Sequence, residues 1–122
     1  MSRVVHFEIP VENPEPVLKF YKEVFGWTYQ KWDGPEEYWL VTTGPNEQPG
    51  INGGIMRRPK GDAGVVNTVA VASLAKTVAQ VEKSGGSVVV PKMPIKGVGY
   101  VAYCTDPEGN IFGVHETDAS AQ

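Results

Sequence analysis

The sequence predicts an α+β domain made of two βαβββ modules in tandem, with mixed sheets that form an open cup. Apolar residues follow the same order of patterns in each half of the chain: an alternating run, a run at helical spacing, and three further strand-like runs. The 14 glycines and 10 prolines among 122 residues are spread along the chain and separate many short elements. A chain of this length is expected to form one domain.

The first half begins with a predicted strand and a predicted helix. Apolar and polar side chains alternate over residues 4–9, as they do in a half-buried strand. Apolar residues then recur at helical spacing over residues 14–25. Asn13 is a suitable N-cap for this helix, and Gly26 is a suitable residue to end it.

Three further strands complete the first half. They are predicted over residues 27–32, 38–43 and 51–56. Clusters of Gly, Pro, Asp and Asn separate these runs and indicate turns. Residues 57–64 are polar and contain a proline and two glycines, so they are interpreted as a linker at the midpoint of the chain.

The second half repeats this order. A strand is predicted over residues 65–72 and a helix over residues 74–83, with Ser73 as its N-cap. The three strands that follow are predicted over residues 87–90, 99–105 and 111–116. Residues 91–97, which include two prolines, are predicted to be a loop, and the tail from Thr117 is expected to be loose.

The two halves also share sequence. Residues 38–45 resemble residues 100–107, with Tyr, Thr and Pro at matching positions. The expected organisation is a single domain over residues 1–122, with one module at about residues 3–58 and the other at about residues 64–117. One helix covers only one face of a four-stranded sheet, so the other faces of two modules, either within one chain or across a dimer, are expected to line a cup for a small molecule.

Charge and composition exclude several classes of protein. The 11 basic and 14 acidic residues give a net charge of −3, so no basic surface for nucleic acid is expected. Apolar runs are too short to span a membrane, and the first residues lack the apolar core of an export signal. The single cysteine, Cys104, excludes an internal disulfide and suits a reducing compartment. A cytoplasmic location is therefore expected.

Four pieces of sequence carry a family resemblance. They are Val5-His6-Phe7 and the segments FYKEVFGW at residues 20–27, VEKSGG at residues 81–86 and TDPEGN at residues 105–110. In this order and spacing, the chain resembles the vicinal oxygen chelate superfamily, which includes glyoxalase I, bleomycin-resistance proteins and extradiol dioxygenases. The resemblance implies paired βαβββ modules and, for a small single-chain member, a homodimer.

The same resemblance implies where a metal would bind. Metal-dependent members hold a divalent cation with His or Glu from the first and last strands of each module. In this chain the four positions fall on His6, Gly54, Val66 or Asn67, and Gly113. The choice between Val66 and Asn67 stays open. Because one expected ligand of four is present and a catalytic metal needs about three protein ligands, no cofactor is expected at these positions.

A different set of ligands is the alternative. Strand alternation puts His115 on the same face as Gly113, so His6, Glu8 and His115 could all point into the cup and hold Zn, Ni, Fe or Mn. The other interpretation is that these side chains are polar lining. The candidates for lining a ligand cup are His6, Glu8, Trp39, Asn67, Tyr100 and His115.

Two other reactive side chains are interpreted as structural. Glu116 lies three residues after Gly113, so alternation places it on the other face of the strand, where an exposed carboxylate at the strand end is expected. Cys104 lies inside a predicted strand and is expected to be a buried thiol rather than a nucleophile.

Two functions stay open on these grounds. The first is a metal-independent protein that binds a small organic ligand, in the manner of the bleomycin-resistance proteins, which sequester a ligand between two subunits. The second is a lyase or dioxygenase of the glyoxalase type, in which a divalent cation polarises the substrate and a carboxylate moves a proton. The missing ligands at Gly54 and Gly113 favour the first, and whether the protein is an enzyme is left undecided.

Overall fold

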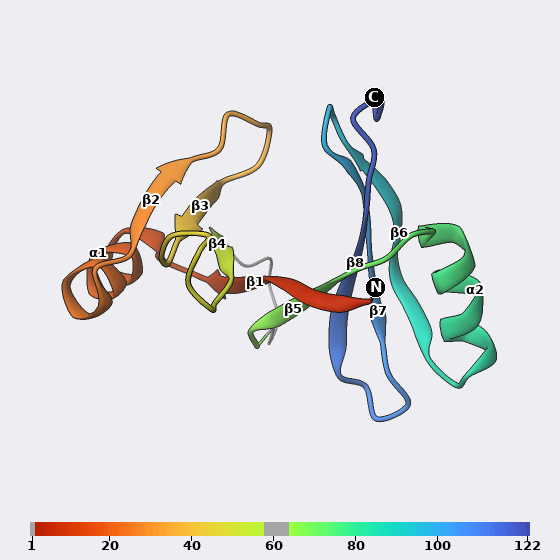
Figure 1. Ribbon diagram of the computed structural model, residues 1–122. Helices are drawn as coiled ribbons and strands as arrows, with labels where there is room; N and C mark the ends of the chain where they lie inside the picture. The colour runs from red at the N-terminus through yellow and green to blue at the C-terminus, as the bar shows by residue number, and fades with distance from the viewer. Residues whose placement is uncertain (1, 58–63) are drawn as a thin grey trace. The chain divides into compact units, whose positions relative to one another are not determined.

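The computed structural model describes residues 2–57 and 64–122, in which eight strands and two helices follow one another in the order βαβββ–βαβββ (Figure 1). This order confirms the predicted α+β class and the internal repeat. Contacts divide the chain into two compact units. The described residues of His6–Val66 form the first unit, and those of Asn67–Gln122 together with Met1–Val5 form the second.

The first unit contains a four-stranded sheet in the order β2-β3-β4-β1 and one helix. Its elements are β1 (Arg3–Val11), α1 (Pro14–Phe25), β2 (Thr28–Lys31), β3 (Tyr38–Thr42) and β4 (Asn52–Arg57). Strands β1 and β4 are parallel, whereas the β2–β3 and β3–β4 pairs are antiparallel. Helix α1 has the predicted bounds, and each strand overlaps its predicted run.

The core of the first unit lies between α1 and one face of this sheet. Its buried residues are Val11, Leu18, Val41 and Ile55. The side chains packed against them include Phe7 and Ile9 of β1. Because side chains alternate along a strand, this packing assigns the odd-numbered positions of β1 to the helix side and the even-numbered positions to the opposite side.

The second unit repeats this architecture with its sheet in the order β5-β8-β7-β6. Its elements are β5 (Val66–Ala70), α2 (Leu74–Lys83), β6 (Ser87–Ile95), β7 (Gly99–Thr105) and β8 (Ile111–Thr117). Each strand is described whole with the unit that holds most of it, so Arg3–Val5 are counted with the first unit and Val66 with the second. Strands β5 and β8 are parallel, and the other pairs are antiparallel. Leu74, Ala102 and Val114 form its buried core under α2.

The helix ends follow the predicted signals. Gly26 ends α1 in the left-handed conformation, at a φ of 75°, and its amide donates to the Lys22 carbonyl at 2.9 Å. Ser73 caps α2, and its hydroxyl accepts a hydrogen bond from the Lys76 amide at 3.2 Å. Asn13 is the N-cap residue of α1 as predicted, but its side chain makes no capping bond.

Strand β6 corrects the sequence prediction. Residues 91–97 were expected to be a loop, yet β6 continues to Ile95. Its pairing with β7 shifts register between Val88 and Val90 and again between Val90 and Met93. Strand β6 lies at the edge of its sheet, where bulges and a proline without an N–H are tolerated. The prolines therefore mark an edge strand rather than a loop.

The C-terminal tail is also more ordered than predicted. Strand β8 runs to Thr117, and the Asp118 amide then donates to the Val98 carbonyl at 2.9 Å. The Gly97 amide donates to the Ala121 carbonyl at 2.9 Å, and Ala121 is buried. The tail thus packs on the turn between β6 and β7.

Two other predictions concern the middle of the chain and the membrane. Most of the expected linker, residues 58–63, lies outside the described residues, and Arg57 belongs to β4. Among the helices that the structure describes, none is long and apolar enough to cross a membrane.

Candidate functional site

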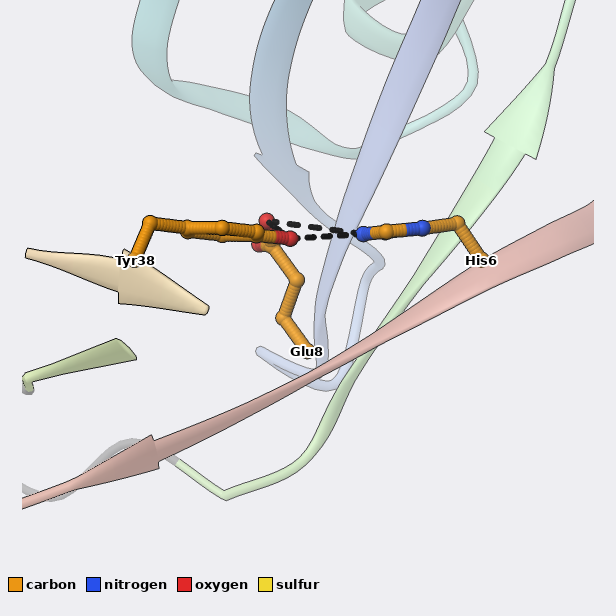
Figure 2. A network of polar contacts seen from close by, with 3 residues as sticks. All are labelled: His6, Glu8 and Tyr38. Carbon is orange, nitrogen blue, oxygen red and sulfur yellow. Dashed lines mark hydrogen bonds and ion pairs between the residues drawn. The ribbon is translucent and has the colours of Figure 1, made fainter. Parts of the chain in front are cut away.

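Three polar side chains meet on the face of the first unit's sheet that α1 does not cover. His6 and Glu8 alternate with the core residue Phe7 on β1, and Tyr38 precedes the core-packed residue Trp39 on β3. Alternation therefore turns all three away from the core. Figure 2 shows the imidazole, the carboxylate and the phenol converging from the two strands.

The Tyr38 hydroxyl joins the other two groups. Nε2 of His6 lies 2.7 Å from Oη of Tyr38, and Oη donates to Oε2 of Glu8 at 2.9 Å. Nε2 of His6 and Oε2 of Glu8 are 4.0 Å apart. Oη has one proton, which makes the hydrogen bond to Glu8, so Oη acts as the acceptor toward His6. This arrangement requires the form of His6 that has its proton on Nε2. The network thus runs from an imidazole N–H through a phenol to a carboxylate.

The burial of Glu8 makes this network important for stability. Glu8 is only 7% exposed, and a buried carboxylate is costly unless hydrogen bonds compensate for lost water. The bond from Tyr38 supplies part of that compensation.

Gly54 explains why Tyr38 reaches this position. In the pairing of β1 with β4, Gly54 lies directly beside Glu8. A Cβ atom built on Gly54 would lie 2.1 Å from Oη of Tyr38, so the phenol occupies the space of the missing side chain. The family resemblance puts a metal-binding side chain at Gly54; here a tyrosine hydroxyl from the neighbouring strand takes that space.

Tyr38 is not among the candidates predicted from the sequence. A signal for it exists: on the next strand, Gly54 pairs with Leu40, so a long side chain two residues from Leu40 can lie across the glycine. The signal requires the register of three strands, which periodicity alone does not supply.

The register also settles which residue of the second unit corresponds to His6. Gly54 pairs with Glu8, and Gly113 pairs with Thr68. Since Gly54 and Gly113 are equivalent, Thr68 corresponds to Glu8, and the residue two positions earlier, Val66, corresponds to His6. Val66 is buried and has no donor atom for a metal.

The space beside Gly113 is less crowded. A Cβ atom built there would lie 3.0 Å from Oγ1 of Thr68 and 3.4 Å from the Tyr103 ring. These are tight contacts, but small movements of the neighbours can relieve them. At the equivalent glycine of the first unit, no comparable adjustment would suffice.

Three of the predicted lining residues lie elsewhere. Trp39 packs against the core under α1, and Tyr100 packs against the core under α2. Asn67 precedes Thr68 on β5, so alternation turns it to the α2 side, where it is exposed. Their predicted orientation toward an open sheet face is therefore corrected. His6, Glu8 and His115 point to the faces that the helices leave uncovered.

His115 belongs to the second unit, where it pairs with Val101 of β7. Burial lowers the pKa of its imidazole from the ordinary value of 6.5, and the neighbouring Glu116 carboxylate opposes this shift. Near neutral pH the ring is therefore uncharged.

Glu116 and Cys104 have structural roles. Glu116 lies on the helix side of β8 as predicted, but it is not a loose carboxylate, because Oε1 accepts a hydrogen bond from the Leu74 amide at the start of α2, at 2.8 Å. Cys104 is fully buried. Desolvation raises the pKa of its thiol, and the negative charge of Glu82 raises this pKa further. A raised pKa disfavours the thiolate that a nucleophile needs.

The donor atoms at the family's metal positions do not form a metal site. His6 is present, but Val66, Gly54 and Gly113 supply no side-chain ligand. Across residues 2–57 and 64–122, no group of three or more His, Cys, Asp or Glu side chains could hold a metal ion. The residues present therefore do not fit the cation that the family resemblance implies.

The comparisons with known proteins agree with the fold. The sequence model of the Glyoxalase/Bleomycin resistance protein/Dioxygenase superfamily matches residues 3–114. Curated proteins give no significant match.

Three solved structures show the same architecture. A hypothetical protein from Bacillus halodurans C-125 has a TM-score of 0.73 and 15% identity, with 99% of this chain and 98% of that chain covered. Methylmalonyl-CoA epimerase from Mycobacterium tuberculosis has a TM-score of 0.71 and 13% identity, with 94% and 87% covered.

A variant of the Streptomyces coelicolor methylmalonyl-CoA epimerase, in complex with 2-nitronate-propionyl-CoA, has a TM-score of 0.70 and 12% identity, with 100% and 99% covered. At such identities these likenesses concern the fold alone. The family model covers most of the sequence, and on that basis the chain belongs to the Glyoxalase/Bleomycin resistance protein/Dioxygenase superfamily.

Proposed function

We propose that this protein binds a small organic ligand on the uncovered sheet face of its first unit, without the divalent metal of its metal-dependent relatives. The observation that carries the proposal is the position of the Tyr38 hydroxyl. It fills the space above Gly54 and hydrogen-bonds both His6 and Glu8. The one retained ligand of the family's metal site is thus engaged by a phenol.

The chemistry of this face supports an organic ligand. Imidazole, phenol and carboxylate groups together offer donors and acceptors beside aromatic rings, which suits a polar organic molecule. The solved epimerase structure with a bound 2-nitronate-propionyl-CoA shows that a protein of this fold can hold an organic ligand. A binding role also agrees with the raised pKa of Cys104, which provides no activated nucleophile.

Metal analysis tests the metal-independent part of the proposal. Purified protein is analysed by mass spectrometry for bound Zn, Ni, Fe and Mn, and its melting temperature is measured with each cation added. We expect less than stoichiometric metal and no shift in melting temperature beyond that of His6→Ala. Stoichiometric metal that disappears in His6→Ala would favour the alternative, a metal-dependent lyase or dioxygenase of the glyoxalase type.

A fragment screen tests the binding part. Small organic acids, amides and aromatic compounds are added to the protein while the NMR signals of its two histidines are followed. We expect binders that move the His6 signal and lose affinity in Tyr38→Phe. Binders that move neither histidine, or that bind Tyr38→Phe equally well, would place the ligand elsewhere.

Assembly as a homodimer in the cytoplasm completes the proposal. The sequence resemblance implies the dimer, and light scattering on the eluted protein measures its mass directly. A mass equal to one chain at micromolar concentration would contradict it.

A further inference from the structure

The hairpin between β2 and β3 places a second aromatic ring beside the polar network. Trp32 directly follows β2, and its amide donates to the Tyr38 carbonyl at 2.8 Å, which closes the hairpin. The two rings meet edge to face, with centroids 6.2 Å apart and planes at 77°. Such an edge-to-face geometry is favourable for an aromatic pair.

Gly34 gives the indole its place. A Cβ atom built on Gly34 would lie 2.3 Å from carbons of the Trp32 ring, so the indole packs directly on the glycine backbone. The first unit therefore has two aromatic rings that each occupy the space of an absent glycine side chain. The Trp32 ring lies across Gly34, and the Tyr38 ring lies across Gly54.

The ring contact can be separated from the backbone of the hairpin. The hydrogen bond from Trp32 to Tyr38 uses main-chain atoms and does not depend on the side chain at position 32. At the other end of the turn, Glu37 pairs with Arg57 of β4. Changes to the indole therefore test the ring contact while these anchors remain.

We infer that Trp32 is a positioning residue of the site. Its indole limits the movement of the Tyr38 ring and so keeps Oη between His6 and Glu8. The biological meaning of this role rests on the proposed function, because the network must be preformed to bind a ligand. The contact itself belongs to the ligand-free protein and can be tested without a ligand.

NMR of the histidine side chains tests the inference. The chain has two histidines, so long-range proton–nitrogen spectra give two sets of ring signals, and His6→Gln assigns them. In the native protein we expect His6 to have its ring proton on Nε2. Tyr38→Phe removes the bond to Oη, so its spectrum gives the reference position of the His6 signal without that bond. Trp32→Ala should move the His6 signal more than half of the way to that value, whereas Trp32→Phe should restore most of it.

Two glycine variants provide a matched pair. Gly34→Ala displaces the indole while it leaves Trp32, Tyr38, His6 and Glu8 in the sequence, so it should reproduce the effect of Trp32→Ala. A Cβ atom on Gly44, in the next hairpin, would meet only the end of the Gln48 side chain at 3.9 Å. Gly44→Ala should therefore leave the His6 signal unchanged.

His115 serves as the internal reference, because it belongs to the other unit. If Trp32→Ala and Gly34→Ala destabilise the protein but leave the His6 signal at its native position, Trp32 is merely structural and the inference is wrong. This result would not affect the proposed function, which the metal and fragment experiments test separately. A positive result here together with stoichiometric metal would instead refute the proposed function alone.

Discussion

The two units share one topology but differ at equivalent positions of their uncovered sheet faces. The first unit has His6 and Glu8 on β1, where the second has Val66 and Thr68 on β5. Both have glycine at the next equivalent position, on β4 and β8. The fold therefore requires neither the imidazole nor the carboxylate. The polar network is a property of one copy of a repeated scaffold.

A second difference concerns the hydrogen bond between the last strand of each unit, β4 or β8, and the start of the helix in the same unit. Arg57 ends β4, and its Nη1 donates to the Glu12 carbonyl just before α1, at 2.6 Å. Glu116, at the equivalent position of β8, accepts from the Leu74 amide at the start of α2. Equivalent positions of the two units thus bind the start of the helix with side chains of opposite charge, a guanidinium in the first unit and a carboxylate in the second.

Replacing the two equivalent glycines with alanine gives the largest expected contrast. Gly54→Ala forces the Tyr38 ring out of the network, so the cost of overpacking, about 1–3 kcal/mol, is added to the loss of the hydrogen bond to Glu8. Gly113→Ala needs only small movements, and the loss of unfolded-state entropy offsets part of their cost, so we expect a change below about 1 kcal/mol.

Denaturant unfolding measures this contrast unit by unit. All three tryptophans, Trp27, Trp32 and Trp39, belong to the first unit, and the single cysteine, Cys104, belongs to the second. Tryptophan fluorescence therefore reports the first unit, and thiol labelling reports the second. Equal losses in the two variants would contradict the proposed role of the space above Gly54.

Removing the Tyr38 hydroxyl should have the next largest effect. Tyr38→Phe deprives the buried Glu8 of a hydrogen bond, and such a loss to a charged acceptor costs about 1.5–3 kcal/mol, reduced if water replaces the hydroxyl. In the background of Glu8→Gln, the same substitution should cost less. A double-mutant cycle followed by tryptophan fluorescence measures the difference, and strict additivity would show that the bond contributes nothing.

The helix cap in the second unit should contribute less. Glu116→Ala leaves the Leu74 amide without its acceptor and should destabilise the second unit by about 1 kcal/mol. Glu116→Gln keeps a side-chain acceptor and should recover part of this loss. Thiol labelling of Cys104 under denaturant follows the effect, and equal stability of the two variants would argue against a capping bond.

The pH dependence due to His115 should be the smallest effect. Its pKa in the folded protein is lowered by burial, so below about pH 6.5 the unfolded chain binds more protons than the folded one. The stability that His115 contributes is present above that pH and is lost as the pH falls. His115→Gln should make the stability profile flatter as the pH falls below about 6.5.

Glu116→Gln sharpens this pH test. The Glu116 carboxylate raises the pKa of His115, so its neutralisation should move the NMR titration of His115 to lower pH. A titration that stays in place would show that burial alone sets the pKa.

The elements of the fold could largely be predicted from the sequence, because periodicity depends on local side-chain order. The bounds of both helices follow from apolar spacing and from caps such as Gly26 and Ser73. Strand β6 could not be predicted in full, since whether Pro91 ends a strand depends on its place at the edge of the sheet.

The candidate site was predicted in part for a related reason. His6 and Glu8 share a face by simple alternation, which the sequence reveals. The role of Tyr38 and the choice of Val66 over Asn67 depend on strand register, which nonlocal pairing sets. Trp39 and Tyr100 were assigned to the wrong face because an aromatic residue in a strand suits either side.

The prolines of β6 have a consequence for the behaviour of the protein at high concentration. An outer strand with a regular row of amides and carbonyls can recruit a strand from another molecule, which is how ordered aggregates grow. In β6, Pro91 and Pro94 remove two amides, and the shifts in register disturb the regular spacing of the others. Strand β6 is therefore a poor template for the addition of a strand from another molecule. Replacing both prolines with valine should make the protein more prone to aggregate.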